Sequence, residues 1–158
     1  MGSPAERSKA VRFAPVRLEF TKLDPAVELP SYAHEGDAGL DLRANAEVTV
    51  KPGERAMVPT GLAVAIPAGH AGMVLPRSGL ASRRGLTLAN APGLIDAGYR
   101  GEIIVAVVNL DREEAVEIGR GDRIAQLMVV PFAQVEPVEV GELPASPRGG
   151  GGFGSTGR

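Results

Sequence analysis

A chain of 158 residues is long enough for one domain with a hydrophobic core. The net charge of −2 does not favour bulk binding to nucleic acid, and the absence of cysteine excludes a disulfide scaffold, a thiolate zinc site and a cysteine nucleophile. No apolar run is long enough to span a membrane, and the N-terminus lacks the apolar core of a signal peptide, so we expect a cytoplasmic protein without a membrane partner.

Thirteen prolines and 21 glycines, with few long helical periods, predict an all-β domain with many turns. Residues 1–15 are polar and lack periodicity, so we interpret them as a flexible lead-in. Alternating or apolar runs predict strands, and glycine–proline clusters predict turns between them. Strands are expected at 16–23, in four short runs within 46–76, and at 86–90, 103–110, 114–118, 122–132 and 133–140. Turns are expected at 51–53, 59–61 and 67–69, with a hairpin bend at 91–102.

One short helix is predicted at 78–85, with Ser78 as its N-cap and Gly85 as its stop. The run at 103–110 is apolar at nearly every position, which indicates a strand buried on both faces. In the final predicted strand, Pro137 favours an edge position or pairing with another copy of the chain. Short strands at intervals of about ten residues are typical of a sandwich or barrel.

Two polar segments near the predicted strands could carry chemistry. In GDAGLDL (36–42), Asp37 and Asp41 are either turn aspartates that bond their own backbone or members of a site. In PRSGLA (76–81), Arg77 leaves a strand where the helix begins. Together with Ser78 and Gly79 it could hold a phosphate, or it could be a surface arginine beside a capped helix.

The densest group of candidates is NAPGLIDAGYRGEI (90–103). The Asn90 amide both donates and accepts, so it could read the edge of a heterocycle. Asp96 in the bend could act as a general base on water, and Tyr99 could pack against a sugar. The alternative is a turn aspartate, a core tyrosine and turn glycines.

Two further candidates lie near the C-terminus. Gln126 interrupts the apolar run IAQLMVV, so its amide needs either an internal backbone partner or a ligand. The terminal RGGGGFGSTGR (148–158) is either a linker or a segment whose N–H groups wrap an anion. In that second case Phe153 could stack on a base, and Ser155 and Thr156 could bind phosphate oxygens. A P-loop motif is absent.

Taken in order, five segments resemble the five motifs of the trimeric deoxyuridine triphosphatases (dUTPases). They are AGLDL (38–42), PRSGLA (76–81), GLIDAGYRGEI (93–103), GDRIAQL (121–127) and RGGGGFGSTG (148–157). The resemblance implies a distorted jelly-roll-like barrel of the β-clip type, all-β with one short helix. It also implies a homotrimer with active sites at subunit interfaces and exchanged C-terminal segments. The domain would span 16–140, and an arm at 141–158 would close over an active site.

The resemblance further implies a dUTP diphosphatase, which hydrolyses dUTP to dUMP and pyrophosphate with Mg2+. This reaction keeps uracil out of DNA and supplies dUMP for dTMP synthesis. Asp96 would activate the water that attacks the α-phosphorus, and Asp41 would support the water network of a Mg2+ held mainly by the phosphates. The base and sugar would meet Asn90, Gly93, Leu94, Ile95, Tyr99 and Phe153. The phosphates would meet Arg77, Ser78, Gly79, Gln126, Arg148, Ser155 and Thr156.

Two other functions remain open on the same fold. A dCTP deaminase-like enzyme would use a glutamate-centred site to remove the amine of the base. A non-catalytic nucleotide-sensing trimer would bind without turnover. Asp96 in IDAGYRGE, together with the complete Phe-Gly-Ser-Thr arm, favours the pyrophosphatase. The partners expected are therefore dUTP and further copies of this chain, with no nucleic acid.

Overall fold

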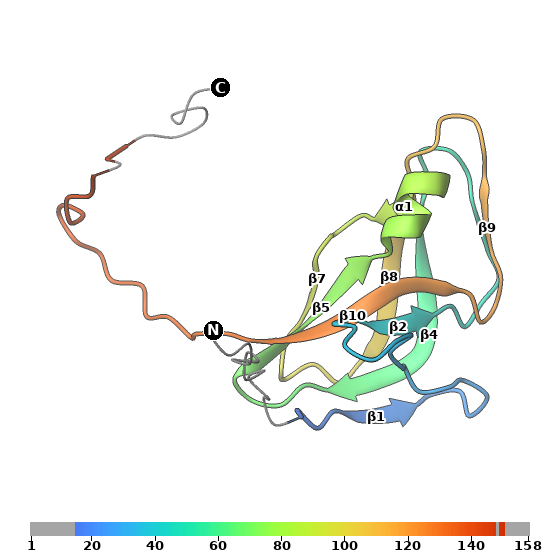
Figure 1. Ribbon diagram of the computed structural model, residues 1–158, viewed down its shortest axis with the longest axis horizontal. Coiled ribbons are helices and arrows are strands. Elements are labelled where there is room, and N and C mark those ends of the chain that lie inside the picture. The colour runs from blue at the N-terminus through green and yellow to red at the C-terminus, as the bar shows by residue number, and fades with distance from the viewer. Residues whose placement is uncertain (1–14, 148, 151–158) are drawn as a thin grey trace, which may run out of the picture.

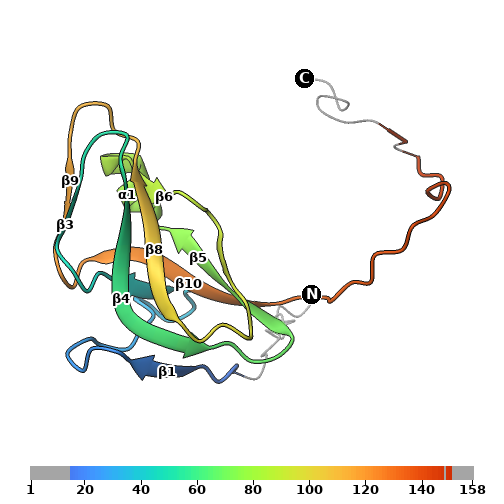
Figure 2. The same cartoon turned by 180° about the vertical axis from the view of Figure 1, so that it is seen from behind.

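The computed structural model describes residues 15–147 and 149–150. Within them, antiparallel strands form three open sheets, and one short helix accompanies them (Figures 1 and 2). The elements are β1 (Glu19–Lys22), β2 (Leu40–Arg43), β3 (Val48–Val50), β4 (Arg55–Ala65), β5 (His70–Pro76), α1 (Ser78–Arg84), β6 (Leu86–Leu88), β7 (Gly93–Ile95), β8 (Glu102–Asn109), β9 (Val116–Ile118) and β10 (Arg123–Pro131). The predicted all-β class with one short helix is confirmed.

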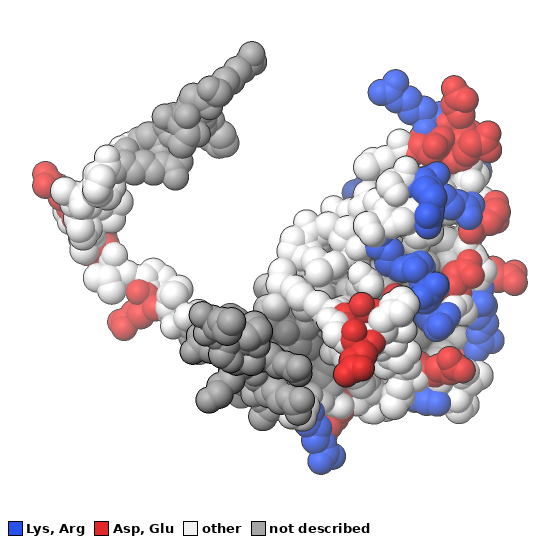
Figure 3. Space-filling model, in the orientation of Figure 1, with Lys and Arg blue, Asp and Glu red and all other residues white. Residues whose placement is uncertain are grey.

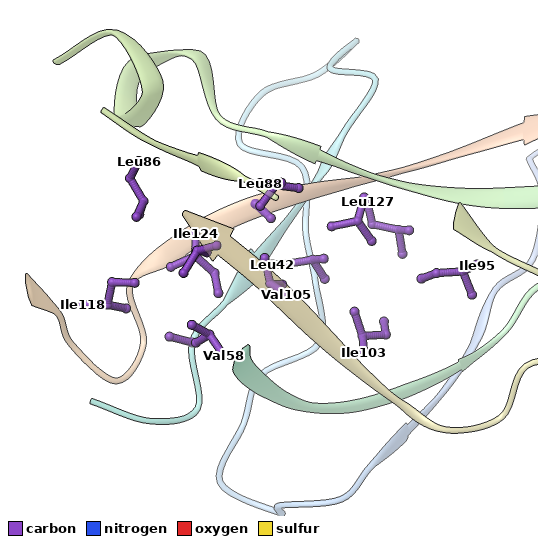
Figure 4. Packing of buried hydrophobic residues seen from close by; sticks show 14 of the residues in the cluster. Leu42, Val58, Leu86, Leu88, Ile95, Ile103, Val105, Ile118, Ile124 and Leu127 are labelled. Carbon is purple, nitrogen blue, oxygen red and sulfur yellow. The ribbon is translucent and has the colours of Figure 1, made fainter. Parts of the chain in front are cut away.

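Two four-stranded sheets enclose the core. Their strand orders are β1-β4-β8-β6 and β2-β10-β5-β7, and β3 with β9 forms a separate two-stranded ribbon. The inward positions of both sheets supply one apolar cluster, in which Leu42, Val58, Val107 and Leu127 are fully buried (Figure 4). Burying these side chains contributes about 1.5–3 kcal/mol each, so this cluster is the main source of stability.

The predicted turn at 59–61 is wrong, because these residues lie inside the single long strand β4. Pro59 pairs with Ile104 of β8 and Ala63 pairs with Glu102, so the intervening residues of β4 form a bulge. Gly61 has a φ of +69°, a left-handed conformation that glycine adopts without steric cost. A proline and a glycine therefore mark a bulge here, since strand pairing resumes on both sides.

The hairpin predicted at 91–102 is also not formed. β7 pairs with β5 in one sheet, whereas β8 pairs with β4 and β6 in the other. The segment from Asp96 to Gly101 therefore crosses from one sheet to the other. Alternation in a sequence predicts a strand but does not specify its partner. A pocket lies between β7 and β8 beside this crossing segment.

The strand β8 is buried on one face only, which corrects the expectation for 103–110. Ile103, Val105 and Val107 are at most 2% exposed, whereas Ile104 between them is 46% exposed. The outer face of β8 is apolar yet open in this chain. An apolar strand face in this state is suited to contact with a further chain.

The helix α1 ends as predicted but begins differently. Gly85 adopts the left-handed conformation, and its N–H donates to the carbonyl of Ala81. The N-cap is Arg77, with no side-chain cap hydrogen bond, and Ser78 is the first helical residue. The serine N-cap was therefore wrong by one position, which leaves the Ser78 hydroxyl uncommitted to capping.

Residues 132–147 leave the body as an extended segment that no strand accompanies (Figure 1). The strand predicted at 133–140 is not formed. Val135, Val138 and Leu143 are 72–84% exposed along this segment. An alternating pattern requires a neighbouring strand before it becomes a sheet, and the described chain provides none here.

Candidate functional site

The first part of the candidate site is a pocket of about 280 Å³ between β7 and β8. Asn90, Gly93, Leu94, Ile95 and Tyr99 all line it, together with the first residues of β8 and with Met57 of β4. The five residues predicted to contact the base and sugar within the described chain therefore come together. The pocket is mainly apolar with a few polar groups, a combination typical of small-molecule sites.

The backbone of β7 and the Asn90 amide supply polar groups to the wall of this pocket. Gly93 pairs with Val74 of β5, and a side chain at Gly93 would meet the Asn90 amide nitrogen at 3.3 Å. Leu94 is 65% exposed and projects outward, whereas Ile95 is 7% exposed and packs in the core. Asn90 is exposed and therefore free to hydrogen bond to a ligand.

Tyr99 is held in place from two sides. Its hydroxyl donates to the backbone carbonyl of Glu102 at 2.9 Å, and its N–H donates to the carbonyl of Asp96 at 3.0 Å. A Cβ on Gly101 would lie 2.6 Å from Cζ of the ring, so a larger residue there would displace the ring. The tyrosine is half-exposed and forms one wall of the pocket rather than part of the core.

Asp96 follows β7 directly and is exposed to solvent at the entrance to the crossing segment. Its carbonyl accepts from Tyr99, which fixes the backbone of the turn. None of the side-chain hydrogen bonds found in the described residues uses its carboxylate. The carboxylate is therefore available to accept a proton from water.

The second part of the site is a cluster around the buried carboxylate of Asp41, which is 7% exposed. Arg123 Nη1 lies 3.2 Å from Asp41 Oδ2, and Arg77 Nε lies 3.6 Å from Asp41 Oδ1. Arg77 Nη1 also donates to the carbonyl of Arg123 at 2.8 Å. One carboxylate therefore aligns two guanidinium groups, an arrangement suited to binding a phosphate chain.

Sheet register explains why these residues meet. Asp41 of β2 and Leu75 of β5 are both direct partners of Gln126 in β10, and Arg77 follows at the end of β5. A side chain at Gly39 would meet Gln126 Cδ at 3.3 Å, so the amide lies over that glycine. Lys and Arg side chains, interspersed with Asp and Glu, gather on the side of the body that carries α1 and β9 (Figures 1 and 3).

The residue of this cluster that sequence analysis missed is Arg123. It stands beside Asp122 in GDRIAQL, where two adjacent residues of opposite charge could simply pair or form a turn. In the structure, Asp122 Oδ2 instead accepts from the N–H of Gly119 at 2.8 Å, while Arg123 reaches Asp41. The available signal was its position in a motif three residues before Gln126. Its partner could be identified only from the pairing of β2 with β10.

The two parts of the site lie at opposite ends of β5. Asp96 follows Ile95, which pairs with Gly72, whereas Arg77 follows the last residue of β5. The five residue-to-residue steps from 72 to 77 correspond to about 16 Å at about 3.3 Å per step. One chain therefore does not place Asp96 beside the arginine cluster. The predicted Arg148, Phe153, Ser155 and Thr156 lie outside the described residues.

Other electrostatic features of the described chain lie away from these groups. The backbone N–H of Ala26, followed by the Asn45 amide, holds the pKa of Asp24 below its usual value. Backbone N–H groups of Glu114 and Glu113 lower the pKa of Asp111 in the same way. Within residues 15–147, no three His, Cys, Asp or Glu side chains form a group that could hold a metal. No helix in this part of the chain is both long and apolar enough to cross a membrane.

These features define an all-β protein with a pocket of about 280 Å³ and a separate pair of arginines on a buried carboxylate. The dUTPase family model matches residues 26–157, and the chain belongs to this family. The deoxyuridine 5'-triphosphate nucleotidohydrolase of Streptomyces avermitilis is 58% identical over 91% of this chain and 82% of its own length. The enzyme of the same name from Thermobifida fusca is 53% identical over 99% and 88%.

Solved structures agree with the sequence relatives. The dUTPase of Staphylococcus bacteriophage 80alpha with dUpNHpp superposes with a TM-score of 0.83, at 31% identity over 90% of this chain and 99% of that one. A mutant dUTPase from phage phi11 of S. aureus, which coordinates a structural Mg(II) ion, gives a TM-score of 0.74. Its identity is 28%, over 80% and 98% of the two chains. The class of enzyme is therefore that of the dUTP diphosphatases.

Proposed function

We propose that this protein hydrolyses dUTP to dUMP and pyrophosphate, by attack of water on the α-phosphorus. The single observation that carries the proposal is the pocket between β7 and β8, where Tyr99 forms a wall and the exposed Asp96 directly follows the last residue of β7. A pocket of about 280 Å³ is of the order of a nucleoside, and the chain belongs to a family named for this substrate.

Base recognition is assigned to Asn90 and to the backbone from Gly93 to Ile95. The edges of uracil and cytosine differ in which atoms donate, so a wrong base would leave polar groups of the pocket unpaired. The methyl group of thymine is excluded by lack of room. Tyr99 packs under the deoxyribose, where a 2'-hydroxyl would collide with the ring.

The phosphates are assigned to the Asp41 cluster, with Arg77, Ser78, Gly79 and Gln126. Asp41 also fits the proposed Mg2+, because its buried Oδ1 has no hydrogen-bond donor and can accept from a metal-bound water. A magnesium ion held by substrate phosphates does not need an all-protein cage. When bound, Mg2+ neutralises the charge that develops on the phosphates. Asp41 would orient this water, and the two arginines that it pairs with would contact the phosphate oxygens.

Asp96 is assigned the chemical step. Its carboxylate accepts a proton from water as the water oxygen attacks the α-phosphorus. The bond between the α-phosphorus and the bridging oxygen breaks, and pyrophosphate leaves with that oxygen. The hydrogen bond from Tyr99 N–H to the Asp96 carbonyl holds the turn that presents this carboxylate. Nucleophile and base are thereby positioned together, which is the main source of acceleration for such a step.

A homotrimer with active sites between subunits is the assembly that we propose. Support comes from the distance of about 16 Å along β5 that separates Asp96 from Arg77 within one chain. The open outer face of β8 also supports it, as does the extended segment 132–147 that leaves the body (Figure 2). The barrel domain at 16–140 would then carry the folded parts of the site. The arm at 141–158 would close over a neighbour's nucleotide.

In the cell, the reaction would remove dUTP before it enters DNA and would provide dUMP for dTMP synthesis. The cytoplasm is the compartment that we propose for it. Four residues of the C-terminal segment complete the assignment: Arg148, Ser155 and Thr156 on the terminal phosphate, and Phe153 over the base.

A pyrophosphate-release assay with dUTP, dTTP, dCTP and UTP in the presence of Mg2+ tests the proposal. We expect turnover of dUTP and a kcat/KM at least about a hundredfold lower for the other three, because each leaves a polar group unpaired or lacks room. Ammonia release from dCTP would instead support a deaminase. Binding of dUTP without pyrophosphate release would support a nucleotide sensor.

A further inference from the structure

The bulge in β4 stands opposite Ile103, a residue that lines the pocket. Three residues of β4, from Thr60 to Leu62, stand opposite one residue of β8, Ile103. A bulge of this kind removes ladder hydrogen bonds, and the groups left over need other partners. Two side chains supply them. Thr60 Oγ1 donates to the carbonyl of Ile103 at 2.7 Å, and Glu102 Oε1 accepts from the N–H of Gly61 at 2.7 Å.

Backbone hydrogen bonds from two other segments of the chain also fix the bulge. The N–H of Leu23 donates to the carbonyl of Gly61 at 2.8 Å, and the N–H of Asn45 donates to the carbonyl of Pro59 at 2.8 Å. Any Cβ at Gly61 would lie 2.8 Å from the Asn45 amide nitrogen and 2.9 Å from Val27 Cγ1. The Gly61 N–H therefore has a fixed position, and it can serve as an anchor for Glu102.

Glu102 connects this anchor to the pocket. Its side chain binds the bulge, while its backbone carbonyl is the acceptor for the Tyr99 hydroxyl at 2.9 Å. Glu102 also lines the pocket at the start of β8. The carboxylate is only partly exposed and has no arginine or lysine within ion-pair distance among the described residues. A charged acceptor on a backbone N–H gives a stronger bond than a neutral one.

We propose that Glu102 is a positioning residue for sugar discrimination: its carboxylate fixes the first residue of β8 to the β4 bulge, and thereby fixes the Tyr99 ring. This inference rests on the proposed function, because it concerns the selection of dUTP over UTP. Loss of the anchor frees the Glu102 carbonyl, the tyrosine hydroxyl follows it, and the ring no longer excludes a 2'-hydroxyl. Displacement of about 1 Å is enough to change such a preference.

The test replaces Glu102 with alanine and with glutamine. We expect Glu102→Ala to raise KM for dUTP and to lower the ratio of kcat/KM for dUTP over UTP about tenfold, with a smaller change in kcat. Glu102→Gln keeps an oxygen that accepts from the Gly61 N–H, so it should restore the ratio to within about twofold. Glu19→Ala is the matched control, because Glu19 lies on β1, a strand that also pairs with β4, and its carboxylate forms an ion pair with the exposed Arg17 away from the pocket.

Coupling to Tyr99 separates positioning from a general loss of stability. In a Tyr99→Phe background the hydroxyl is already absent, so adding Glu102→Ala should change the dUTP/UTP ratio by much less than it does alone. Fully additive effects on that ratio would overturn the proposal. So would an unchanged ratio in a folded Glu102→Ala protein, or equal losses in the alanine and glutamine variants.

Two further measurements keep the result decisive. If Glu102→Ala does not fold, Thr60→Val removes only the hydroxyl that holds Ile103 and should lower the ratio in the same direction. Binding of non-hydrolysable imido analogues of dUTP and UTP measures the same preference without turnover. Failure of the wild-type protein to hydrolyse dUTP would therefore count against the proposed function alone.

Discussion

Replacement of Asp96 with asparagine is expected to lower kcat for dUTP by a factor of about a hundred to ten thousand, the range in which a general base contributes. The amide has nearly the same shape as the carboxylate but cannot accept a proton from water. The carbonyl of residue 96, which accepts from the Tyr99 N–H, is unaffected by the change. We therefore expect folding, assembly and nucleotide affinity to persist while the chemical step is lost.

Steady-state pyrophosphate release measures this loss, and calorimetric binding of an imido analogue of dUTP measures the affinity. Glu47→Gln is the matched control, because it removes an exposed carboxylate that lies before β3 and away from the pocket. Turnover of the Asp96→Asn protein within about threefold of wild type would remove Asp96 from the role of base. A large loss of affinity would indicate a binding role instead.

Removal of residues 148–158 is the second change for which we expect a large effect. The segment carries Arg148, which we propose for the terminal phosphate, Phe153, which we propose for the base, and the hydroxyls of Ser155 and Thr156. The pocket between β7 and β8 is open to solvent on the described chain, so a cover would exclude bulk solvent while leaving the attacking water in place. We expect the truncated protein to retain its thermal stability and to lose most of its kcat/KM for dUTP, about a hundredfold or more.

A full-length variant with alanine at Phe153, Ser155 and Thr156 distinguishes side chains from chain length. If the side chains act as proposed, this variant should lose activity nearly as far as the truncated protein does. Full activity in this variant would indicate that the glycine-rich segment is a linker without a role in the site. Unchanged kinetics after truncation would have the same meaning, and circular dichroism on each variant checks that the fold is retained.

Much of the fold could be predicted, because strand periodicity and glycine–proline clusters are local signals. The helix predicted at 78–85 corresponds to α1, and the strand predicted at 122–132 corresponds to β10, each within about two residues at either end. The β4 bulge was interpreted as a turn, because Pro59 and Gly61 stand together in the sequence whether a strand ends or continues. What decides between the two is the pairing of β4 with β8, which is not local.

The candidate site shows the same division. Asn90, Tyr99 and Asp96 could be grouped from sequence since they are close neighbours in one segment. The link from Arg123 to Asp41 could not, because 82 positions separate them and only the register of β2 on β10 brings them together. The separation of Asp96 from Arg77 also depends on topology. It follows from the pairing of β7 with β5, where the hairpin pattern predicted a different neighbour.

The position of Glu102 illustrates a role that sequence patterns conceal. It is the last charged residue before the apolar run of β8, so its natural interpretation is a solvated strand end. In the structure its side chain accepts a hydrogen bond from the Gly61 N–H in the β4 bulge, and its backbone carbonyl accepts one from the Tyr99 hydroxyl. The Gly61 N–H comes from 41 positions earlier in the chain, and the bulge creates the need for this partner.

The central claim is that water, activated by Asp96, attacks the α-phosphorus of dUTP. Hydrolysis in water enriched in the heavy isotope of oxygen, followed by mass spectrometry of both products, tests it most directly. The account predicts that the label enters dUMP and that pyrophosphate carries none. Label in pyrophosphate would place the attack on the β-phosphorus and contradict the account.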